Sequence, residues 1–403
     1  MNETVSIRRV AQVFNGGTPT AEPGNWGGDV PWATPTDLAP RDGGLLTQTE
    51  RSLTRFGART GSAVVPAGSI IMSTRAPIGY LVQCNREMAF NQGCRGLVPT
   101  NRILPRFFQH ALTARVDELK ALGTGSTFQE LSTEALGSLR IYLPPQESQR
   151  RIADFLDDQV ARIDAAIQLR LRQREMMDDR LRASLDNIFV EASRENRQVR
   201  RLLAAPPQYG LLPVTPVSDR EDWPRYIRTT DIADDGSLHG HTFKSIDPSE
   251  SVGYIVEPGD VLVSRAGSIG TCAVISETTG RAVFAGYLVR LQFRDFRPRL
   301  FRHFTNSSLF LEQVATNVIQ STIQNFNAEK YASLSMPYIE PSRQQLAEKK
   351  LDALESSTEA LRRGLSLSIG LLEERRWALI TAAVTEEFDV SSAGSRAAAA
   401  VAG

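Results

Sequence analysis

Two long stretches of the chain place apolar residues three or four positions apart. The first runs from Pro145 to about Phe189 and contains no glycine and no further proline. Its apolar positions are Ile152, Leu156, Val160, Ile163, Ile167, Leu171, Met177, Leu181, Leu185 and Ile188. The second has the same spacing at Leu351, Leu354, Leu361, Leu365, Ile369, Leu372, Ile380, Val384 and Phe388. This period is typical of a long amphipathic helix or of the seam of a coiled coil.

Each predicted helix is too long to bury its apolar stripe inside one small domain. At ~1.5 Å per residue, a helix of about 45 residues extends roughly 65 Å. We therefore expect the two helices to pack against each other, and to run antiparallel because each follows its own globular region. Gly364 and Gly370 lie inside the second helix, where each costs ~1 kcal/mol relative to alanine and favours a bend.

The regions before the two helices are rich in glycine, proline and β-branched residues. Short apolar runs between turn residues predict strands at Ser69–Ser73, Leu139–Leu143 and Asp260–Ser264. One amphipathic helix per region is expected to begin near Pro105 and Pro298, because proline is favoured in a first helical turn. We expect two α+β globular domains of ordinary size.

The chain also repeats itself. Five pairs of similar segments follow one another in the same order at offsets of 191 to 195 residues. They are SIRRV with QVRRL, VPWATPTDLAPRDGGLL with WPRYIRTTDIADDGSLHG, PAGSIIMSTRAPIG with EPGDVLVSRAGSIG, PRFFQH with PRLFRH, and STFQ with STIQ. The fold predicted from the sequence is thus α+β, with two similar globular domains alternating with two long helices in a tandem repeat.

These patterns predict five segments. They are a globular domain over 1–145, a helical spacer over 146–195, a second globular domain over 196–340, a second helical spacer over 341–390, and a flexible tail of small residues over 391–403.

Composition narrows the class of protein. The 403 residues carry 46 Lys and Arg against 46 Asp and Glu, so a wholly basic nucleic-acid binder is excluded and any DNA contact must be local. Lysine occurs at only five positions, which leaves 41 arginines; arginine suits phosphates and guanine edges, although a GC-rich genome would also explain the bias. No apolar run of ~18 residues and no signal-like apolar segment at the start are present, and we expect a soluble cytoplasmic protein.

The usual catalytic patterns are missing. GxxxxGK[ST], GxSxG and HExxH do not occur, and three cysteines without a CxxC pair predict neither a disulfide framework nor a zinc site. His239 and His241 have no further ligand nearby and fit a solvated turn. Glu348-Lys349-Lys350 resembles part of a nuclease motif, but a solvated helix face is the preferred interpretation. No metal site is predicted, and we expect a non-catalytic chain.

The duplicated arrangement resembles the specificity subunit of a type I restriction–modification enzyme. STFQELSTEALGSLRIYLPPQESQRRIADFLD resembles the passage from a target-recognition domain into the family's helix, above all Pro144-Pro145, Gln149 and Ile152-Ala153. In the second copy Pro341 stands where Pro145 does and Glu340 replaces the first proline. FNQGCRGLVP also resembles a family strand, and the second copy, AGYLVRL, lacks its Asn-Gln.

The resemblance implies a role in phage defence. Each globular domain would be a target-recognition domain for one half of a bipartite, asymmetric double-stranded DNA site, and the helices would set the spacing. Two methyltransferase subunits would dock on the helices, and motor–nuclease restriction subunits would join the complex. The chain itself would hold no cofactor; S-adenosylmethionine, ATP and Mg would belong to the partners. Two alternatives stay open, a DNA-recognition subunit of another multisubunit restriction or defence system and a coiled-coil adaptor without a DNA role.

Candidate DNA-binding residues are polar or aromatic side chains in turn-like or glycine-rich surroundings. In the first domain they are Arg41, Arg75, Asn91, Gln92, Thr127 and Gln129, and in the second Arg228, Arg265, Ser268, Tyr287, Thr322 and Gln324. RLQFRDFRPRLFRH (Arg290–His303) suggests a phosphate-binding patch with stacking aromatics, but we prefer to read its phenylalanines as core and its arginines as solvated.

Overall fold

The computed structural model describes residues 3–75, 77–124, 130–215, 217–319, 325–385, 387 and 390, and it divides into two compact units. Unit 1 comprises residues 1–170 and 367–403, and unit 2 comprises residues 171–366. Each unit therefore contains one globular domain, the beginning of the long helix that follows this domain, and the end of the other long helix.

Unit 1 is built on three groups of strands. A five-stranded sheet has the order β2-β10-β7-β8-β4, a four-stranded sheet has the order β5-β3-β9-β6, and β1 pairs with β11. The strands are β1 (Glu3–Ser6), β2 (Ala11–Asn15), β3 (Trp26–Ala33), β4 (Leu45–Leu46), β5 (Arg51–Leu53), β6 (Ala63–Val65), β7 (Ile70–Thr74), β8 (Ile78–Cys84), β9 (Met88–Phe90), β10 (Cys94–Pro99) and β11 (Arg140–Leu143).

Unit 2 repeats this plan with fewer strands in its described residues. Its sheets are β13-β18-β15-β16, the parallel pair β14-β17 and the antiparallel pair β12-β19. The strands are β12 (Glu195–Gln198), β13 (Gln208–Tyr209), β14 (Arg225–Ile227), β15 (Val261–Ser264), β16 (Cys272–Val274), β17 (Ala282–Phe284), β18 (Leu288–Leu291) and β19 (Ser335–Tyr338).

Short helices connect the strands in both units. The α-helices of the globular parts are α1 (Pro35–Leu38), α2 (Arg55–Gly61), α3 (Pro105–Thr113), α4 (Val116–Ala121), α5 (Thr133–Ser138), α7 (Pro298–Thr305), α8 (Ser308–Ile319) and α9 (Ala328–Ser333). The 3-10 turns are η1 (Ile7–Arg9), η2 (Pro23–Asn25), η3 (Ala39–Arg41), η4 (Val199–Arg201), η5 (Thr229–Asp231), η6 (Pro248–Ser251) and η7 (Glu277–Thr279). Helices α3 and α7 begin at the predicted prolines.

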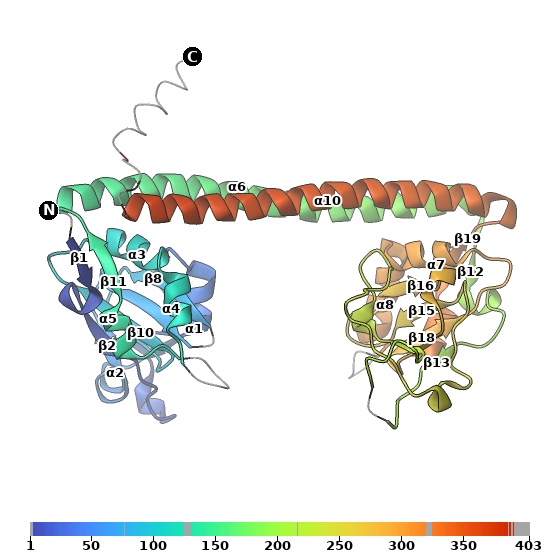
Figure 1. The fold of residues 1–403 in the computed structure, drawn as a ribbon, viewed down its shortest axis with the longest axis horizontal. Coiled ribbons are helices and arrows are strands. Elements are labelled where there is room, and N and C mark those ends of the chain that lie inside the picture. The colour runs from blue at the N-terminus through green and yellow to red at the C-terminus, as the bar shows by residue number, and fades with distance from the viewer. Residues whose placement is uncertain are drawn as a thin grey trace, which may run out of the picture. The chain divides into compact units, whose positions relative to one another are not determined.

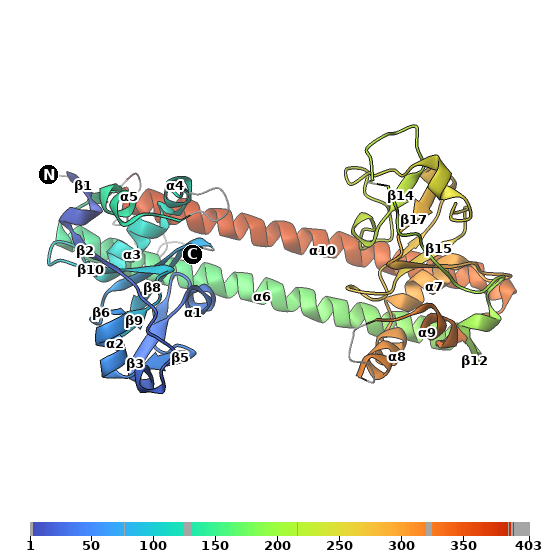
Figure 2. The same cartoon turned by 90° about the horizontal axis from the view of Figure 1, so that it is seen from below.

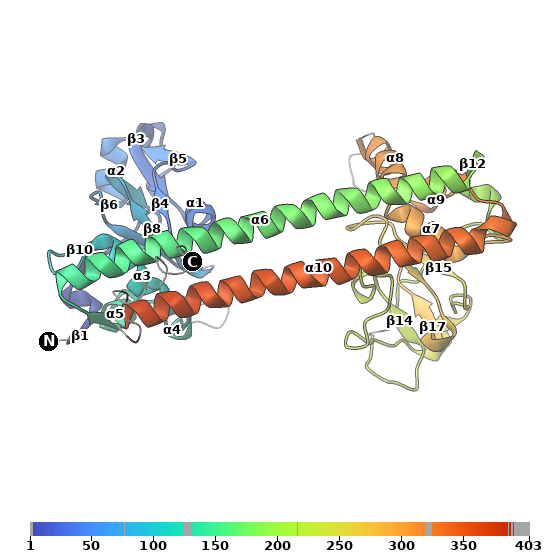
Figure 3. The same ribbon diagram turned by 90° about the horizontal axis from the view of Figure 1, so that it is seen from above.

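The two long helices are α6 (Gln146–Ala192) and α10 (Pro341–Val384), of 47 and 44 residues. Helix α10 continues through Gly364 and Gly370. In all three ribbon views α6, drawn in green, and α10, drawn in red, run side by side (Figures 1, 2 and 3).

Ion pairs between the long helices fix their direction. In unit 1 Arg376 lies 2.9 Å from Asp164, and in unit 2 Arg362 lies 2.7 Å from Asp178. The two aspartates are two heptads apart on α6, and the two arginines are two heptads apart on α10 in the opposite order. The helices are therefore antiparallel with one register, as the heptad-like spacing predicts.

Each core joins a globular domain to both long helices. In unit 1 the sheet and α3 pack around Leu156 of α6 and Ile380 of α10. In unit 2 Phe189 of α6 and Leu351 of α10 pack with a cluster of phenylalanines from α7 and its surroundings. The fold class predicted from the sequence is confirmed. Among the described residues, no helix combines the length and apolar character needed to cross a membrane.

Candidate nucleic-acid interface

One edge of each unit has the same backbone hydrogen bonds. The amide of Thr74 donates to the carbonyl of Gly93 over 2.8 Å. In unit 2 the amide of Arg265 donates to the carbonyl of Tyr287 over 2.9 Å. Likewise, the Thr74 carbonyl accepts from Leu131 and the Arg265 carbonyl accepts from Phe326. Thr74 therefore corresponds to Arg265, and Gly93 corresponds to Tyr287.

A loop beside this edge also makes matching hydrogen bonds in the two units. The amide of Gly17 donates to the carbonyl of Phe90, and the amide of Leu211 donates to the carbonyl of Phe284. Both loop carbonyls accept an aromatic donor, Trp32 Nε1 at 3.0 Å in unit 1 and the Tyr226 hydroxyl at 3.1 Å in unit 2. The segment 15–18 thus corresponds to 209–212, and 91–93 corresponds to 285–287.

Different side chains occupy these matching positions. We call the unit 1 surface the polar edge; it comprises Asn15, Thr18, Arg75, Asn91, Gln92 and Glu130. We call the unit 2 surface the aromatic edge; it comprises Tyr209, Leu212, Arg265, Ser268 and Tyr287.

Hydrogen bonds hold the polar edge together. Asn91 Oδ1 accepts from the Gly93 amide over 3.0 Å, and the Thr18 hydroxyl donates to Gln92 Oε1. Glu130 lies 3.2 Å from Arg95 and 4.0 Å from Arg75. Arg95 is largely buried, whereas Arg75 and Glu130 are half-exposed. The edge therefore presents amide, hydroxyl and guanidinium groups, which suit base edges and phosphates.

The aromatic edge presents carbon surface and one cation. Leu212, Tyr287 and Tyr209 are 72%, 61% and 40% exposed. The Arg265 guanidinium lies 4.8 Å from the centre of the Tyr209 ring. Within the described residues no carboxylate forms an ion pair with Arg265, so its charge is not balanced by a neighbour.

The structure brings together part of the predicted DNA-binding set. Arg75, Asn91 and Gln92 lie on the polar edge; Arg265, Ser268 and Tyr287 lie on the aromatic edge. Thr127, Gln129, Thr322 and Gln324 fall outside the described residues. Their flanking residues pair with the two edges, since Glu130 bridges to Arg75 and Asn325 bridges to Ala266.

Two other predicted residues lie elsewhere. Arg41 is exposed at the end of η3, without an ion pair to any described residue. Arg228 bonds to Asp231 at 2.8 Å and to the Thr242 carbonyl. Burial opposes ionisation of Asp231, but the bond to Arg228 lowers the pKa of this carboxyl below its usual range. DNA contact through Arg228 would compete with this ion pair.

Five edge residues were not predicted from the sequence, namely Asn15, Thr18, Glu130, Tyr209 and Leu212. The usable signal was a pair of matching glycines. A Cβ on Gly16 would lie 1.9 Å from the Asn91 carbonyl oxygen, and one on Gly210 would lie 2.2 Å from that of Ala285. Both loops therefore require glycine for a close backbone approach.

The prediction that the arginines of Arg290–His303 are solvated is confirmed for the exposed Arg294, Arg297 and Arg299 and is wrong for the buried Arg290 and Arg302. The Arg290 side chain is 10% exposed and pairs with Asp260 at 2.5 Å. Arg297 pairs with Glu348 of α10 and Arg302 with Glu355. The phenylalanines are core residues, as predicted, with Phe301 fully buried. Glu348 is also not solvated, because its side chain is only 10% exposed against Arg297.

A buried glutamine ties each domain to the helix that follows it. Gln149 accepts from the Leu104 amide over 2.8 Å and donates to the carbonyls of Arg102 and Pro144. Gln344 makes the same three bonds, to the Arg297 amide and to the carbonyls of Asp295 and Ile339. We call these the glutamine clamps.

Histidines add a second tie. His110 Nε2 lies 2.7 Å from Asp157 of α6, and His303 Nε2 lies 2.8 Å from Asp352 of α10. Burial and the nearby Arg106 guanidinium lower the pKa of His110 to about 4. His303 has a second carboxylate, Glu355, 3.0 Å from Nδ1. The polar edge and the aromatic edge thus belong to domains that are tied to the long helices by matching residues.

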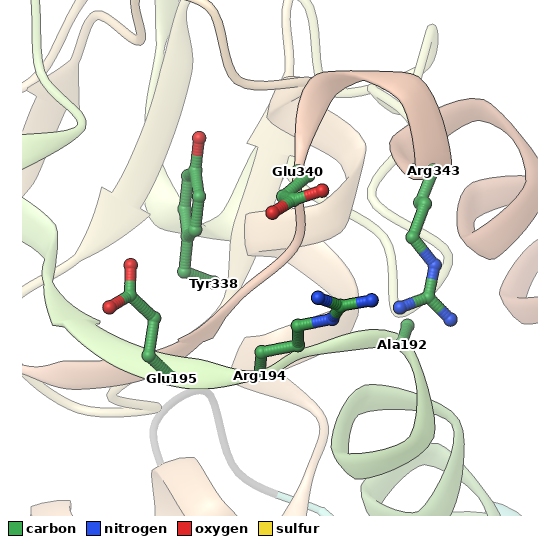
Figure 4. Close-up of a pocket in the computed structure, with 6 residues that line it drawn as sticks. All are labelled: Ala192, Arg194, Glu195, Tyr338, Glu340 and Arg343. Carbon is green, nitrogen blue, oxygen red and sulfur yellow. The ribbon is translucent and has the colours of Figure 1, made fainter.

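Other places in the described residues offer little chemistry. A cavity of about 270 Å³ in unit 2, where α6 passes to β12 and β19 passes to α10, is lined by two arginines and two glutamates (Figure 4). Its charges balance. The rings of His239 and His241 lie 5.1 Å apart and are tilted by 47° to each other. No group of three or more His, Cys, Asp or Glu side chains in the described part of the chain could hold a metal ion.

The two units are duplicated domains fixed to long helices, and comparison with known proteins shows what this arrangement is similar to. Residues 2–173 match the model of the type I restriction modification DNA specificity domain. The chain is 30% identical over 189 residues to the type I restriction enzyme MjaIX specificity subunit of Methanocaldococcus jannaschii. The matched region covers 46% of this chain and 43% of that subunit. It is 25% identical over 308 residues to the EcoBI specificity subunit of Escherichia coli, covering 67% of this chain and 64% of the relative.

A solved structure shares the whole fold. A chain from work on complex assembly and conformational transition of the type I R-M system superposes with a TM-score of 0.72, at 16% identity, over 95% of this chain and 97% of that one. The chain is thus similar to specificity subunits of type I restriction enzymes, and the predicted resemblance is confirmed. The sequence matches span less than two thirds of these relatives. Their names support the prediction of a non-catalytic subunit.

Proposed function

We propose that this chain is the DNA-recognition subunit of a type I restriction–modification complex in the cytoplasm. Each globular domain, over 1–145 and 196–340, reads one half of a bipartite, asymmetric site in double-stranded DNA. The observation that carries the proposal is the pair of edges, which share a backbone frame and differ in their side chains. Two surfaces of one geometry and different chemistry suit two half-sites of different sequence.

The long helices set the distance between the half-sites in this proposal. It is supported by the glutamine clamps, which fix each domain to its helix, and by the single antiparallel register of α6 and α10. Coupled rigid elements fix half-site spacing in other DNA readers.

The helices also dock two methyltransferase subunits, which bind S-adenosylmethionine. Exposed apolar residues support this role: Met176 is 72% exposed, Val190 is 62% exposed, and the exposed Ala183 lies between them at heptad spacing. A motor–nuclease subunit that uses ATP and Mg completes the complex. None of these cofactors is assigned to residues of this chain.

The direct test is sequencing of DNA methylation in the host with and without this gene, followed by exchange of residues 196–340 for a homologous domain. We expect one bipartite motif to vanish on deletion, and one half of it to change on exchange. A motif that survives deletion contradicts the function; an exchange that alters both halves contradicts the modular division.

The spacing is tested separately by inserting one heptad after Leu171 and one before Ile369. Two matched heptads keep the helix seam and add ~10 Å. At ~3.4 Å per base pair, the tolerated spacer should grow by about three base pairs. An insertion in only one helix is the control and should abolish methylation; an unchanged spacer in the double insertion would reject the ruler.

A further inference from the structure

Two exposed apolar side chains on the aromatic edge project from an anchored backbone. Leu212 follows Leu211, whose amide donates to Phe284 and whose carbonyl accepts from Gly286 and from the Tyr226 hydroxyl. Tyr287 is held by its carbonyl, which accepts from the Arg265 amide. Exposure of 72% for Leu212 and 61% for Tyr287 is therefore not a consequence of a loosely attached loop.

The two side chains belong to one projection. A Cβ built on Gly286 would lie 2.9 Å from Cδ2 of Leu212, so the leucine side chain lies against the residue that precedes Tyr287. A side chain at Gly286 would displace Leu212. Glycine at this position leaves room for Leu212 beside the residue that precedes the exposed Tyr287.

A cation stands beside this projection. Arg265 packs its guanidinium on the Tyr209 ring, and no described carboxylate neutralises it. The surface thus combines a phosphate-binding group with apolar tips, which matches a DNA backbone next to a base step.

We propose that Leu212 and Tyr287 form a wedge that enters a base step in the half-site read by unit 2, while Arg265 contacts the adjacent phosphate. The inference rests on the proposed function and assigns different readout to the two units. Unit 1 carries Thr18 and Gly93 at the matching positions and recognises base edges by hydrogen bonds. The wedge selects a step that unstacks easily, such as a pyrimidine–purine step.

The experiment uses the full chain without methyltransferase subunits, because base flipping by those enzymes would also change base stacking. The probe is a duplex carrying the methylated motif, with 2-aminopurine at successive positions of each half-site. Anisotropy reports binding and 2-aminopurine fluorescence reports unstacking in the same titration. The double variant Leu212→Thr, Tyr287→Gly gives unit 2 the residues of unit 1.

We expect wild-type protein to raise fluorescence at one step of the unit 2 half-site and nowhere in the other half-site. The double variant should lose this signal and bind about tenfold more weakly, since the unstacked base loses its stacking partner. Tyr287→Phe keeps the ring and should retain the signal, and Leu346→Ala, an exposed site on α10, should match wild type.

Binding without any fluorescence rise, or a rise that persists in the double variant, overturns the wedge while leaving DNA recognition intact. A loss of signal in Tyr287→Phe as large as in the double variant also overturns it, because the hydroxyl would then act by hydrogen bonding. Absence of any anisotropy change with wild-type protein contradicts the proposed function itself.

Discussion

The polar and aromatic edges are one backbone frame carrying two sets of side chains. Both units have a glycine where two backbone segments approach closely, Gly16 and Gly210. Both also have an aromatic side chain, Trp32 or Tyr226, that donates a hydrogen bond to the loop carbonyl. The side chains that point outward from it are not kept. Thr18 and Gln92, both exposed, stand where unit 2 has Leu212 and Gly286. A duplicated domain can therefore change what it recognises without changing how it folds.

The ties to the long helices differ less than the edges, and the glutamine clamps are the same in both units. We expect Gln149→Ala and Gln344→Ala each to lower the free energy of unfolding of its own unit by about 3 kcal/mol, because three buried hydrogen bonds lose a partner. Hydrogen exchange, measured on peptides of each unit, separates the two effects.

Gln345→Ala is the matched control, since this neighbour of Gln344 is exposed on α10 and should be neutral. If only one of the two clamp variants lowers the free energy of unfolding of its unit, the two domains are attached to their helices differently despite the common geometry of the clamps.

The tie through His110 should make unit 1 sensitive to acid. Because folding lowers the pKa of His110 to about 4, the unfolded chain binds its proton near pH 6.5, well before the folded chain does. Unit 1 should therefore lose about 2 kcal/mol of stability between pH 7 and pH 5. In unit 2 burial opposes ionisation of Asp352 and Glu355, yet their partners lower both pKa values. Their contribution is present above the unfolded carboxyl pKa near 4 and is lost only as the pH falls below it.

Hydrogen exchange of each unit, corrected for the intrinsic rate at each pH, checks this difference. His110→Gln keeps a hydrogen-bonding group but removes the titrating one. The stability of unit 1 in this variant should therefore change less between pH 7 and pH 5. A unit 1 profile that is unchanged in His110→Gln would contradict the assignment.

The arginines of the two edges should contribute unequally to DNA affinity. Arg265→Ala should weaken binding about tenfold, or ~1.4 kcal/mol, because its charge has no described carboxylate partner. Arg75→Ala should cost less, because Glu130 already shares that guanidinium at 4.0 Å. Titrations of cognate duplex at several salt concentrations measure both, and the salt slope should fall more for Arg265→Ala.

Glu130→Gln is the control for this argument, since it frees Arg75 and should strengthen binding. Unaltered affinity in Arg75→Ala on the Glu130→Gln background would remove Arg75 from the proposed interface.

Sequence reasoning predicts the parts of this molecule that periodicity and repetition encode. The long helices, their antiparallel packing and the helices beginning at Pro105 and Pro298 follow from apolar spacing and proline position. The edges follow only partly, because contacts between residues far apart in the chain decide them. The repeat aligns Arg265 with Thr74, as the hydrogen bonds do, but it does not show that Glu130 reaches Arg75 while no described carboxylate pairs with Arg265. Arg228 looks available for DNA until the buried Asp231 is placed beside it.

The ion pairs between the long helices should have the smallest effect, although they report the register in both units. Arg362→Ala and Arg376→Ala remove half-exposed partners of Asp178 and Asp164, and exposed pairs contribute ~0–1 kcal/mol. Urea unfolding should therefore shift by less than ~1 kcal/mol in either variant, with Arg363→Ala, a more exposed neighbour, as control. Because buried leucine, isoleucine and phenylalanine residues hold the helices together, neither variant should open the pair. A loss well above this range in one variant would show that one unit depends on its ion pair where the other depends on apolar packing.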